Sequence, residues 1–334
     1  MNKIIKIAVD AMGGDGSPKK VIDGIIHHFK NNKNSFYKIF GDKDKIQPHI
    51  KSNLSNSSYE IIHTMDIVKG TDSPLEGAKR GKNTSMWLAI QSVKEKKSDV
   101  VISAGNTGAL LVISKLNLNM IENIDKPALS ALWPNKKEMS VVLDLGANIE
   151  CSSKNLIDFS IMGSSLFKSL YPNDNAKVAL LNIGSEELKG NEIIKETFQK
   201  LTQRHNQDFE FKGYIEGNQL MNGDVNVIVA DGFTGNVALK TAEGTANFIT
   251  SELKKVMTGN LIGKISSLLN ISNLKKFKIR LDPRLYNGAI FIGLNSPVIK
   301  SHGGTDYIGF SNSLSVCTKV VSGNLIEKIR NNIN

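Results

Sequence analysis

A short apolar run, a glycine turn and a helix start follow one another in Ile4-Ile5-Lys6-Ile7-Ala8-Val9-Asp10-Ala11-Met12-Gly13-Gly14-Asp15-Gly16-Ser17-Pro18. A run of Ile and Val with little alternation is typical of a strand that is buried on both faces of a sheet. Ser17 followed by Pro18 is typical of a helix N-terminus, with Ser17 as the N-cap and Pro18 at the first helical position. The stretch therefore predicts a buried strand, a tight turn and a helix.

The same pattern recurs along the chain, where short apolar runs end in Gly, Asp or Asn and precede helical patterns. These runs are Asp99–Ser103, Ser140–Leu145, Lys177–Leu181 and Asn226–Ala230. Strands that alternate with helices predict a mainly parallel sheet between two helical layers, a three-layer α/β/α fold. No repeat and no Pro- or Ser-rich linker divides residues 1–334, so we expect one α/β catalytic domain.

Composition narrows the function classes. The 334 residues carry 42 Lys and Arg against 32 Asp and Glu, a net charge of +10, but only 5 of the basic residues are Arg. Arg is the residue for bidentate phosphate and base contacts, so its scarcity argues against nucleic acid as a partner.

Two cysteines, Cys151 and Cys317, cannot build a disulfide framework, which favours a reducing cytoplasm. The first residues resemble a strand rather than a signal peptide, and no apolar run is long enough for a spanning helix.

The segment at about 248–280 differs from the rest of the chain because its glycine turns thin out. Leu261, Ile265, Leu268 and Leu269 recur there at helical spacing, which predicts a helical excursion from the sheet. The excursion is basic, since the chain between positions 254 and 284 carries +7 of the total +10. Two interpretations stay open: a dimerisation arm, or a segment that binds the membrane interface.

In an open α/β sheet, ligands bind beyond the carboxyl ends of the strands, so the loops at those ends are the candidate sites. Glycines and small polar residues gather in these loops, and we expect the loops to line one cleft. The candidates are Gly13, Gly14, Asp15, Asn106, Thr107, Gly146, Asn148, Ser185, Lys189, Asp231, Asn236 and His302. Each has a plainer interpretation as a turn glycine, a helix cap, a partner of local backbone or a surface side chain.

The loops lack the usual protein nucleophiles. They contain no G-x-S-x-G elbow, they exclude both cysteines, and the histidines of the chain lack metal-ligand spacing. We therefore expect neither a metal nor a cofactor. Such a site is typical of an enzyme whose nucleophile is itself a substrate, bound as an anion.

Taken together and in order, the loops resemble those of the bacterial phosphate acyltransferases of the PlsX family. The motifs are Asp10–Asp15, Ser103–Ala109, Leu143–Asn148, Asn182–Gly184 with Lys189–Asn191, Asp231–Asn236 and Lys300–Gly303, and the resemblance extends over about residues 4–325. One departure is Gly303-Gly304-Thr305-Asp306, where the family has a Ser-rich run; this puts the donors of that loop in doubt.

The resemblance implies a fold like that of phosphotransacetylases and of isocitrate and isopropylmalate dehydrogenases. It implies transfer of a long-chain acyl group from acyl carrier protein to inorganic phosphate, which yields an acyl phosphate for phospholipid synthesis. It also implies a cytoplasmic homodimer that associates peripherally with the inner face of the cell membrane, where the membrane acyltransferase PlsY takes the product.

For this reaction we expect Lys189 to neutralise the phosphate and Asn236 to position phosphate or to donate to the oxyanion. Backbone N–H groups of the Gly13-Gly14 and Asn106-Thr107 loops would complete the anion cradle. Two alternatives stay open: a short-chain phosphotransacetylase that uses acyl-CoA, and a basic membrane-surface binding protein without catalysis.

Overall fold

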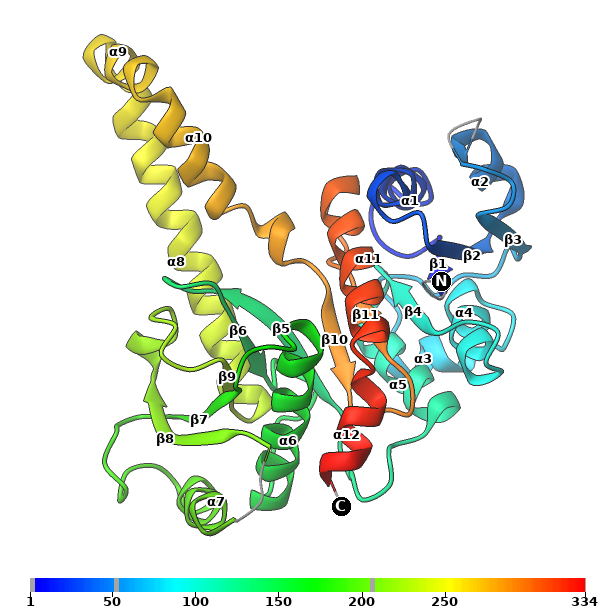
Figure 1. The fold of residues 1–334 in the computed structure, drawn as a ribbon. Helices are drawn as coiled ribbons and strands as arrows, with labels where there is room; N and C mark the ends of the chain where they lie inside the picture. The colour runs from blue at the N-terminus through cyan, green and yellow to red at the C-terminus, as the bar shows by residue number, and fades with distance from the viewer. Residues whose placement is uncertain (1–3, 51–53, 205–207, 334) are drawn as a thin grey trace.

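The computed structural model describes residues 4–50, 54–204 and 208–333 as one eleven-stranded sheet with helices on both sides (Figure 1). The strands are β1 (Ile5–Asp10), β2 (Ser35–Gly41), β3 (Tyr59–His63), β4 (Val100–Ser103), β5 (Ala128–Pro134), β6 (Met139–Leu143), β7 (Lys177–Asn182), β8 (Glu210–Glu216), β9 (Val227–Val229), β10 (Ala289–Ile292) and β11 (Val298–Lys300). The helices are α1 (Lys19–Asn31), α2 (Lys43–Ile50), α3 (Pro74–Lys79), α4 (Ser85–Lys94), α5 (Thr107–Leu118), α6 (Ser153–Leu170), α7 (Glu192–Gln203), α8 (Gly232–Thr258), α9 (Leu261–Leu269), α10 (Ile271–Arg280), α11 (Tyr307–Ser322) and α12 (Leu325–Ile333).

The sheet is mainly parallel, as the sequence predicts, but its direction reverses in the middle. The strand order is β3-β2-β1-β4-β11-β10-β5-β6-β9-β7-β8. Strand β10 is antiparallel to both β11 and β5, and β5 is antiparallel to β6. The parallel group of β6, β9, β7 and β8 therefore runs opposite to the parallel group of β1 to β4 and β11.

Side chains that alternate along the buried strands explain the two helical layers. Ile7 and Val9 of β1 join a core with helices α1, α6, α11 and α12, whereas Ala8, between them, joins a core with α4 and α5. Helix α8 covers the second face beside β6. Successive residues of a strand point to opposite faces, so a strand buried on both faces must be apolar throughout.

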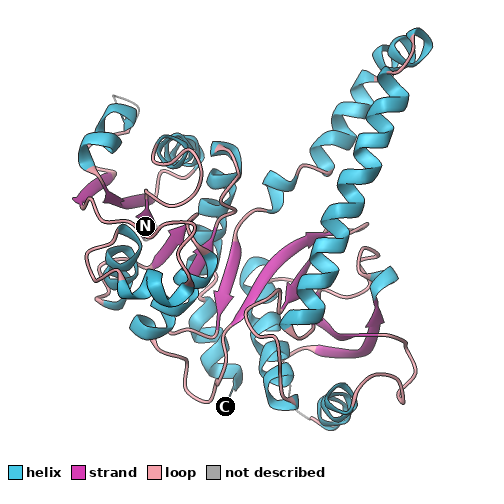
Figure 2. Cartoon of the chain, turned by 180° about the vertical axis from the view of Figure 1, so that it is seen from behind, coloured by secondary structure: helices cyan, strands magenta, loops and turns pink. Residues whose placement is uncertain are grey.

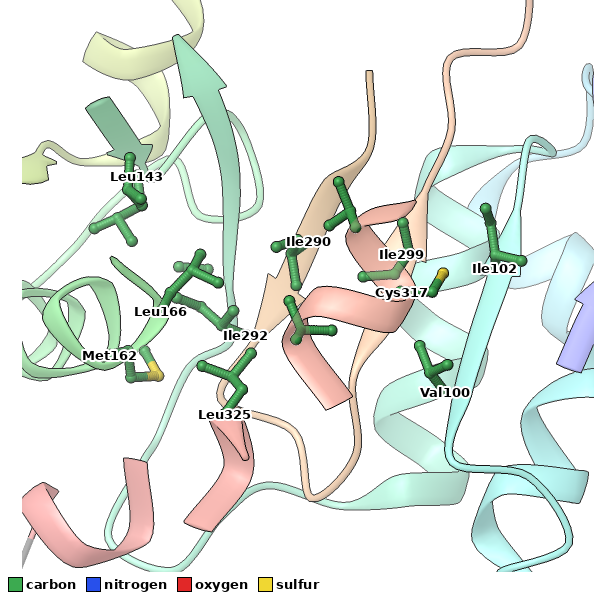
Figure 3. Close-up of a cluster of buried hydrophobic side chains, with 14 of the residues drawn as sticks. Val100, Ile102, Leu143, Met162, Leu166, Ile290, Ile292, Ile299, Cys317 and Leu325 are labelled. Atoms are coloured by element: carbon green, nitrogen blue, oxygen red, sulfur yellow. The ribbon is translucent and has the colours of Figure 1, made fainter. Parts of the chain in front are cut away.

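The larger core continues across the middle of the sheet. Figure 3 shows Leu143 of β6, Ile290 of β10, Ile299 of β11 and Ile102 of β4 in a row across the sheet, with Cys317 of α11 beside Ile299. All of these side chains are buried in one cluster, so the two parallel groups share a core.

All five apolar runs quoted from the sequence form strands, but the first helix begins differently from the prediction. Helix α1 starts at Lys19, and Pro18 precedes it without a side-chain cap. Ser17 is not the N-cap; its hydroxyl donates to the carbonyl oxygen of Gly13 (2.6 Å) and so closes the turn itself. A hydroxyl that caps a helix accepts from a backbone N–H, whereas the Ser17 hydroxyl donates to a carbonyl of the preceding turn.

The helical excursion is a hairpin that projects from the body (Figure 2). Its first helix, α8, starts at Gly232 in the loop after β9. The helical excursion therefore begins closer to the candidate site than the start at about 248 that the sequence predicts. Helices α9 and α10 contain no buried residue. The arm, as we call residues 248–280, is therefore held mainly by contacts between its own helices, and Arg280 at its end donates to the carbonyl oxygens of Asn135 (3.4 Å) and Lys136 (3.2 Å). In the part of the chain that the structure describes, no helix has the length and apolarity needed to cross a membrane.

Candidate functional site

The six candidate loops form two clusters rather than one. Because the strand direction reverses, the loops after β1, β4 and β11 lie at one edge of the sheet, and those after β6, β7 and β9 lie at the other. Strands β4 and β6 are also four inter-strand steps apart, which is ~19 Å at ~4.8 Å per step. The expectation of one shared cleft within a protomer is therefore wrong, because it assumed that every strand runs the same way.

The first loop cluster comprises residues 13–16, 104–107 and 302–304. The Asp15 N–H donates to the carbonyl oxygen of Gly303 (3.0 Å). A Cβ on Gly13 would lie 2.5 Å from the Gly105 nitrogen, and one on Gly14 would lie 2.8 Å from the Ala104 carbonyl oxygen. Gly13 and Gly14 are thus required because backbone packs directly on backbone, and Gly14 also adopts a positive φ of 84°.

The polar side chains of this cluster differ in how many hydrogen-bond donors they leave free for a ligand. Asn106 caps α5 by accepting from the Ala109 N–H (3.0 Å), and its amide donates to the carbonyl oxygens of Gly70 and Asp72. Both amide hydrogens of Asn106 are therefore used, so its side chain has no donor left for a ligand. Thr107 is exposed at the start of α5. His302 is exposed too, and its Nδ1 accepts from the Gly304 N–H (3.2 Å), which makes Nε2 the donor of the neutral ring.

The second loop cluster comprises residues 144–148, 183–191 and 231–236. Asp144 is fully buried and accepts from the N–H groups of Leu129, Gly146, Ala147 and Asn148, as expected for a carboxylate that orders its own loop. Burial raises the pKa of Asp144, although these hydrogen bonds oppose the shift.

Asn148 and Asp231, two predicted binding residues, serve the architecture of this cluster. The Asn148 amide donates to the carbonyl oxygen of Pro127 (2.7 Å) and to the Asp144 carboxylate (2.8 Å), so it has no free donor. Asp231 caps α8 and accepts from both the N–H and the hydroxyl of Thr234 (2.8 Å each). An anionic cap also repels phosphate, so Asp231 is unsuited to bind that group directly.

Asn236, Lys189 and Ser185 are exposed and remain available to a ligand. The Asn236 side chain lies beside Gly146, whose Cβ position would be 3.6 Å from it. The Lys189 ammonium forms no ion pair with a described residue. Ser185 does not begin a helix; α7 begins at Glu192 with Asn191 as its N-cap. Strands β7 and β9 pair in parallel, so the loops that carry Lys189 and Asn236 are neighbours.

A groove of about 930 Å³ opens at this second cluster. It is lined by Asn191 after β7, Asp231 and Phe233 after β9, and Cys151 after β6. Lys126, from the loop before β5, lines the groove as well and donates to the Glu150 carbonyl oxygen (2.8 Å). Two of the predicted loops, 183–191 and 231–236, thus meet at the groove, and the segment just after the third completes it. Of the predicted site residues, Asp231 lines the groove, whereas Lys189 and Asn236 lie on its loops outside the lining.

Cys151 is the residue of the groove that sequence reasoning set aside, because it lies three positions beyond the glycine motif. Burial and the nearby Asp144 raise the pKa of the Cys151 thiol to about 11. At neutral pH the thiol therefore stays protonated and is a poor nucleophile. No group of three or more metal-binding side chains gathers in the described ranges 4–50, 54–204 and 208–333.

Sequence reasoning also missed two lysines in the first cluster, Lys20 and Lys300, which are 8% and 9% exposed. The only signal in the sequence is that Lys300 directly follows the apolar pair Val298-Ile299 and so belongs to a buried strand. Lys20 offers no such signal, because the side of α1 that faces the loops is set by tertiary packing.

Comparisons with known proteins fit this arrangement. Residues 5–328 match the family described as "Fatty acid synthesis protein". The phosphate acyltransferase of Pelagibacter ubique (strain HTCC1062) is 87% identical over 333 residues, covering 100% of both chains. That of Maricaulis maris (strain MCS10) is 40% identical over 337 residues, covering 100% of this chain and 96% of the relative.

Solved structures of phosphotransacetylases share the fold. The enzyme from Streptococcus pyogenes superposes with a TM-score of 0.62 at 15% identity, covering 98% of this chain and 95% of that one. The EutD phosphotransacetylase from Staphylococcus aureus gives 0.60 at 17% identity, covering 95% and 94%. With two relatives matched over their full length and the family matched across 5–328, the chain belongs to the phosphate acyltransferase family of enzymes.

Proposed function

We propose that the protein transfers a long-chain acyl group from acyl carrier protein to inorganic phosphate, and that the acyl phosphate feeds phospholipid synthesis. The observation that carries this proposal is the groove at the second loop cluster, with Lys189 and Asn236 on the neighbouring loops. The groove of about 930 Å³ is at the upper end of the size range of small-molecule sites, so phosphate alone does not account for it.

The lining of the groove supports an acyl thioester as the second substrate. Ile149 and Phe233 are 75% and 63% exposed, and both line the groove. Exposed apolar side chains beside polar loops are typical of ligand grooves. An acyl chain laid on them would place its thioester near the glycine loops, where the anion donors are.

The reaction needs no protein nucleophile. A phosphate oxygen attacks the thioester carbonyl carbon and forms a C–O bond, and the carbonyl becomes a tetrahedral oxyanion. Collapse of this intermediate breaks the C–S bond; the carrier thiolate leaves and takes up a proton that the phosphate gives up. The site must therefore hold two anions together and stabilise the oxyanion.

Lys189 and Asn236 are suited to these tasks. The Lys189 ammonium pairs with no residue that the structure describes and can offset the charge of phosphate, and Asn236 has an amide with both donor and acceptor capacity. Ser185 is a secondary donor on the Lys189 loop. Asn148 and Asn106 act on the loops rather than on the substrate, since their amide hydrogens are already engaged.

We predict that Lys189→Ala and Asn236→Ala each lower the rate by about 10²–10³, the usual cost of removing one donor to a developing oxyanion. The measurement is release of free carrier thiol from long-chain acyl carrier protein, with and without phosphate. Lys200→Ala is the matched control, because Lys200 is an exposed lysine of α7 that pairs with Glu196.

Near-normal turnover in both folded variants would remove Lys189 and Asn236 from the mechanism. A thioester chain-length series separates the alternatives: preference for acetyl-CoA would favour a short-chain phosphotransacetylase. Absence of any phosphate-dependent thiol release would favour a binding protein without catalysis.

We propose further that the arm joins two copies of the chain and touches the membrane. Leu261, Ile265, Leu268 and Leu269 are 73%, 51%, 68% and 85% exposed, more apolar surface than a free helical hairpin keeps in water without a partner. Lysines and arginines of the same arm complement anionic headgroups and an acidic carrier protein. A membrane acyltransferase such as PlsY would take the product at that surface.

A further inference from the structure

Two buried lysines beside the first loop cluster form no ion pair with any carboxylate that the structure describes. Lys20 of α1 and Lys300 of β11 are each more than nine-tenths buried, and neither forms an ion pair with a described residue. Lysine is almost never this buried unless it is paired, because desolvation of an ammonium is costly.

Backbone carbonyls satisfy only part of the hydrogen-bonding capacity of these ammonium groups. Lys20 Nζ donates to the Gly303 carbonyl oxygen (2.5 Å). Lys300 Nζ donates to the carbonyl oxygens of Ser301 and Ala104, the latter at 3.5 Å. An ammonium has three N–H bonds, so together the two lysines retain three donors without a described acceptor.

The nearest buried acid does not offset both charges. Asp10 is fully buried, and its carboxylate accepts from the hydroxyls of Ser85 (2.7 Å) and Ser103 (2.6 Å) and from the Met12 N–H. Burial raises the pKa of Asp10, while burial and the charge of Lys20 lower the pKa of Lys300 to about 8. One acid thus faces two cations within the buried part of the cluster, and the second acid, Asp15, is exposed.

The neighbourhood adds further donors that point to an anion. Exposed His302 and Thr107 lie in the same loops, and the loop N–H groups follow strands β1, β4 and β11 at their carboxyl ends. Convergent N–H groups and ammonium groups are the usual components of a phosphate site.

We propose that the first loop cluster binds a phosphate group through Lys20 and Lys300, at a site separate from the groove of the second cluster. The phosphate group belongs either to free inorganic phosphate or to the phosphodiester of a phosphopantetheine arm. The inference goes beyond the proposed acyl transfer, and it stands on the buried charges whether or not Lys189 takes part in that reaction.

The test measures the rise in unfolding temperature on ligand addition, in full-length protein that carries Lys189→Ala so that the second cluster contributes little. We expect inorganic phosphate or phosphopantetheine, but not pantetheine, to raise the unfolding temperature. A response to phosphate alone identifies the free ion, and a stronger response to phosphopantetheine identifies the carrier arm.

Adding Lys20→Met or Lys300→Met should weaken the affinity for the phosphate group by about 10- to 100-fold, the cost of one hydrogen bond to a charged group. Lys19→Met is the matched control, because Lys19 is the exposed neighbour of Lys20 and pairs with Asp23. We also expect the two buried Lys→Met variants to unfold at a temperature no lower than their parent in the absence of ligand, since an unpaired buried charge is removed.

The inference is overturned if both variants keep the full response to phosphate and phosphopantetheine, or if the Lys189→Ala protein shows no response at all. If both variants are less stable without ligand but keep the phosphate response, the two lysines hold the loops together and do not bind phosphate. NMR of lysine side chains in the wild-type protein needs no variant: phosphate must raise the pKa of Lys300, and an unchanged pKa would count against the site. Failure of the acyl-transfer proposal shows instead as absence of phosphate-dependent thiol release in the wild-type protein, so the two outcomes are distinguishable.

Discussion

Asn106, Asn148 and Asn236 carry the same side chain in similar glycine loops, yet the structure gives them different roles. The first two spend both amide hydrogens on backbone carbonyls or a carboxylate, whereas Asn236 is exposed beside Gly146. The number of free donors, rather than the residue type, thus decides which asparagine can contact a substrate.

His28 is a residue whose protonation should affect folding stability. It is buried, its Nδ1 lies 2.6 Å from the Tyr37 hydroxyl, and its Nε2 has no hydrogen-bond partner among the residues that the structure describes. Burial and the adjacent His27 lower the pKa of His28 to about 4, well below the value of about 6.5 in the unfolded chain. The unfolded state therefore binds more protons between these values, so stability is full above about pH 6.5 and falls as the pH drops towards 4.

We predict that His28 accounts for a loss of up to about 3 kcal/mol across this interval. His28→Gln keeps an acceptor for the Tyr37 hydroxyl but cannot be protonated, so urea unfolding of the variant should depend less steeply on pH. His49→Gln, at a half-exposed position, should follow the wild type. Identical pH profiles for His28→Gln and wild type would contradict the assignment.

At the scale of the elements, the start of α8 shows that close packing can also explain the glycines of these loops, which in the sequence resemble a phosphate-binding motif. A Cβ on Gly235 would overlap the Asp144 carbonyl oxygen, and one on Gly232 would lie 2.5 Å from the Asn148 carbonyl oxygen. The loops after β6 and β9 are in backbone contact, and this explains both glycines without a ligand. The same pattern in a sequence therefore indicates close loop packing as directly as it indicates phosphate binding.

Two glycines of α8 provide a matched pair of variants. Gly235→Ala should destabilise the protein by about 1–3 kcal/mol because the methyl group forces two loops apart. Gly244→Ala should stabilise it by up to about 1 kcal/mol, since no atom lies within 4 Å of that Cβ position and Ala favours the helix. Urea midpoints test both, and equal midpoints for the two variants would refute the packing argument.

At the scale of the whole molecule, most of the net charge of +10 is concentrated in one segment. The chain between positions 254 and 284, which is most of the arm and its base, carries +7, and most of that charge surrounds the exposed apolar side chains of α9 and α10. Figures 1 and 2 show this hairpin extending away from the sheet. Changes in the arm should therefore alter assembly or membrane attachment with little direct effect on the chemistry.

We predict that replacing Leu261, Ile265 and Leu268 together by Ser releases the protein from anionic phospholipid vesicles, measured by co-sedimentation, with thiol release in solution unchanged. The control replaces Met65, Leu75 and Leu116, three exposed apolar residues outside the arm, by Ser. If sedimentation velocity instead shows that the arm variant loses its dimer, the hairpin serves assembly. Retained vesicle binding and an unchanged assembly would reject both interpretations of the arm.

The sequence alone indicated five of the eleven strands, the mainly parallel sheet and the helical arm, because apolar periodicity and turn glycines are local properties. It also indicated which loops matter. It did not determine where strand direction reverses, since the pairing of β10 with both β5 and β11 depends on contacts between distant residues. The separation of the loops into two clusters follows from the tertiary structure alone. The same is true of the burial of Lys20 and Lys300 and of the lack of free donors on Asn106 and Asn148. Burial and hydrogen-bond partners arise from packing between distant segments, which no local pattern records.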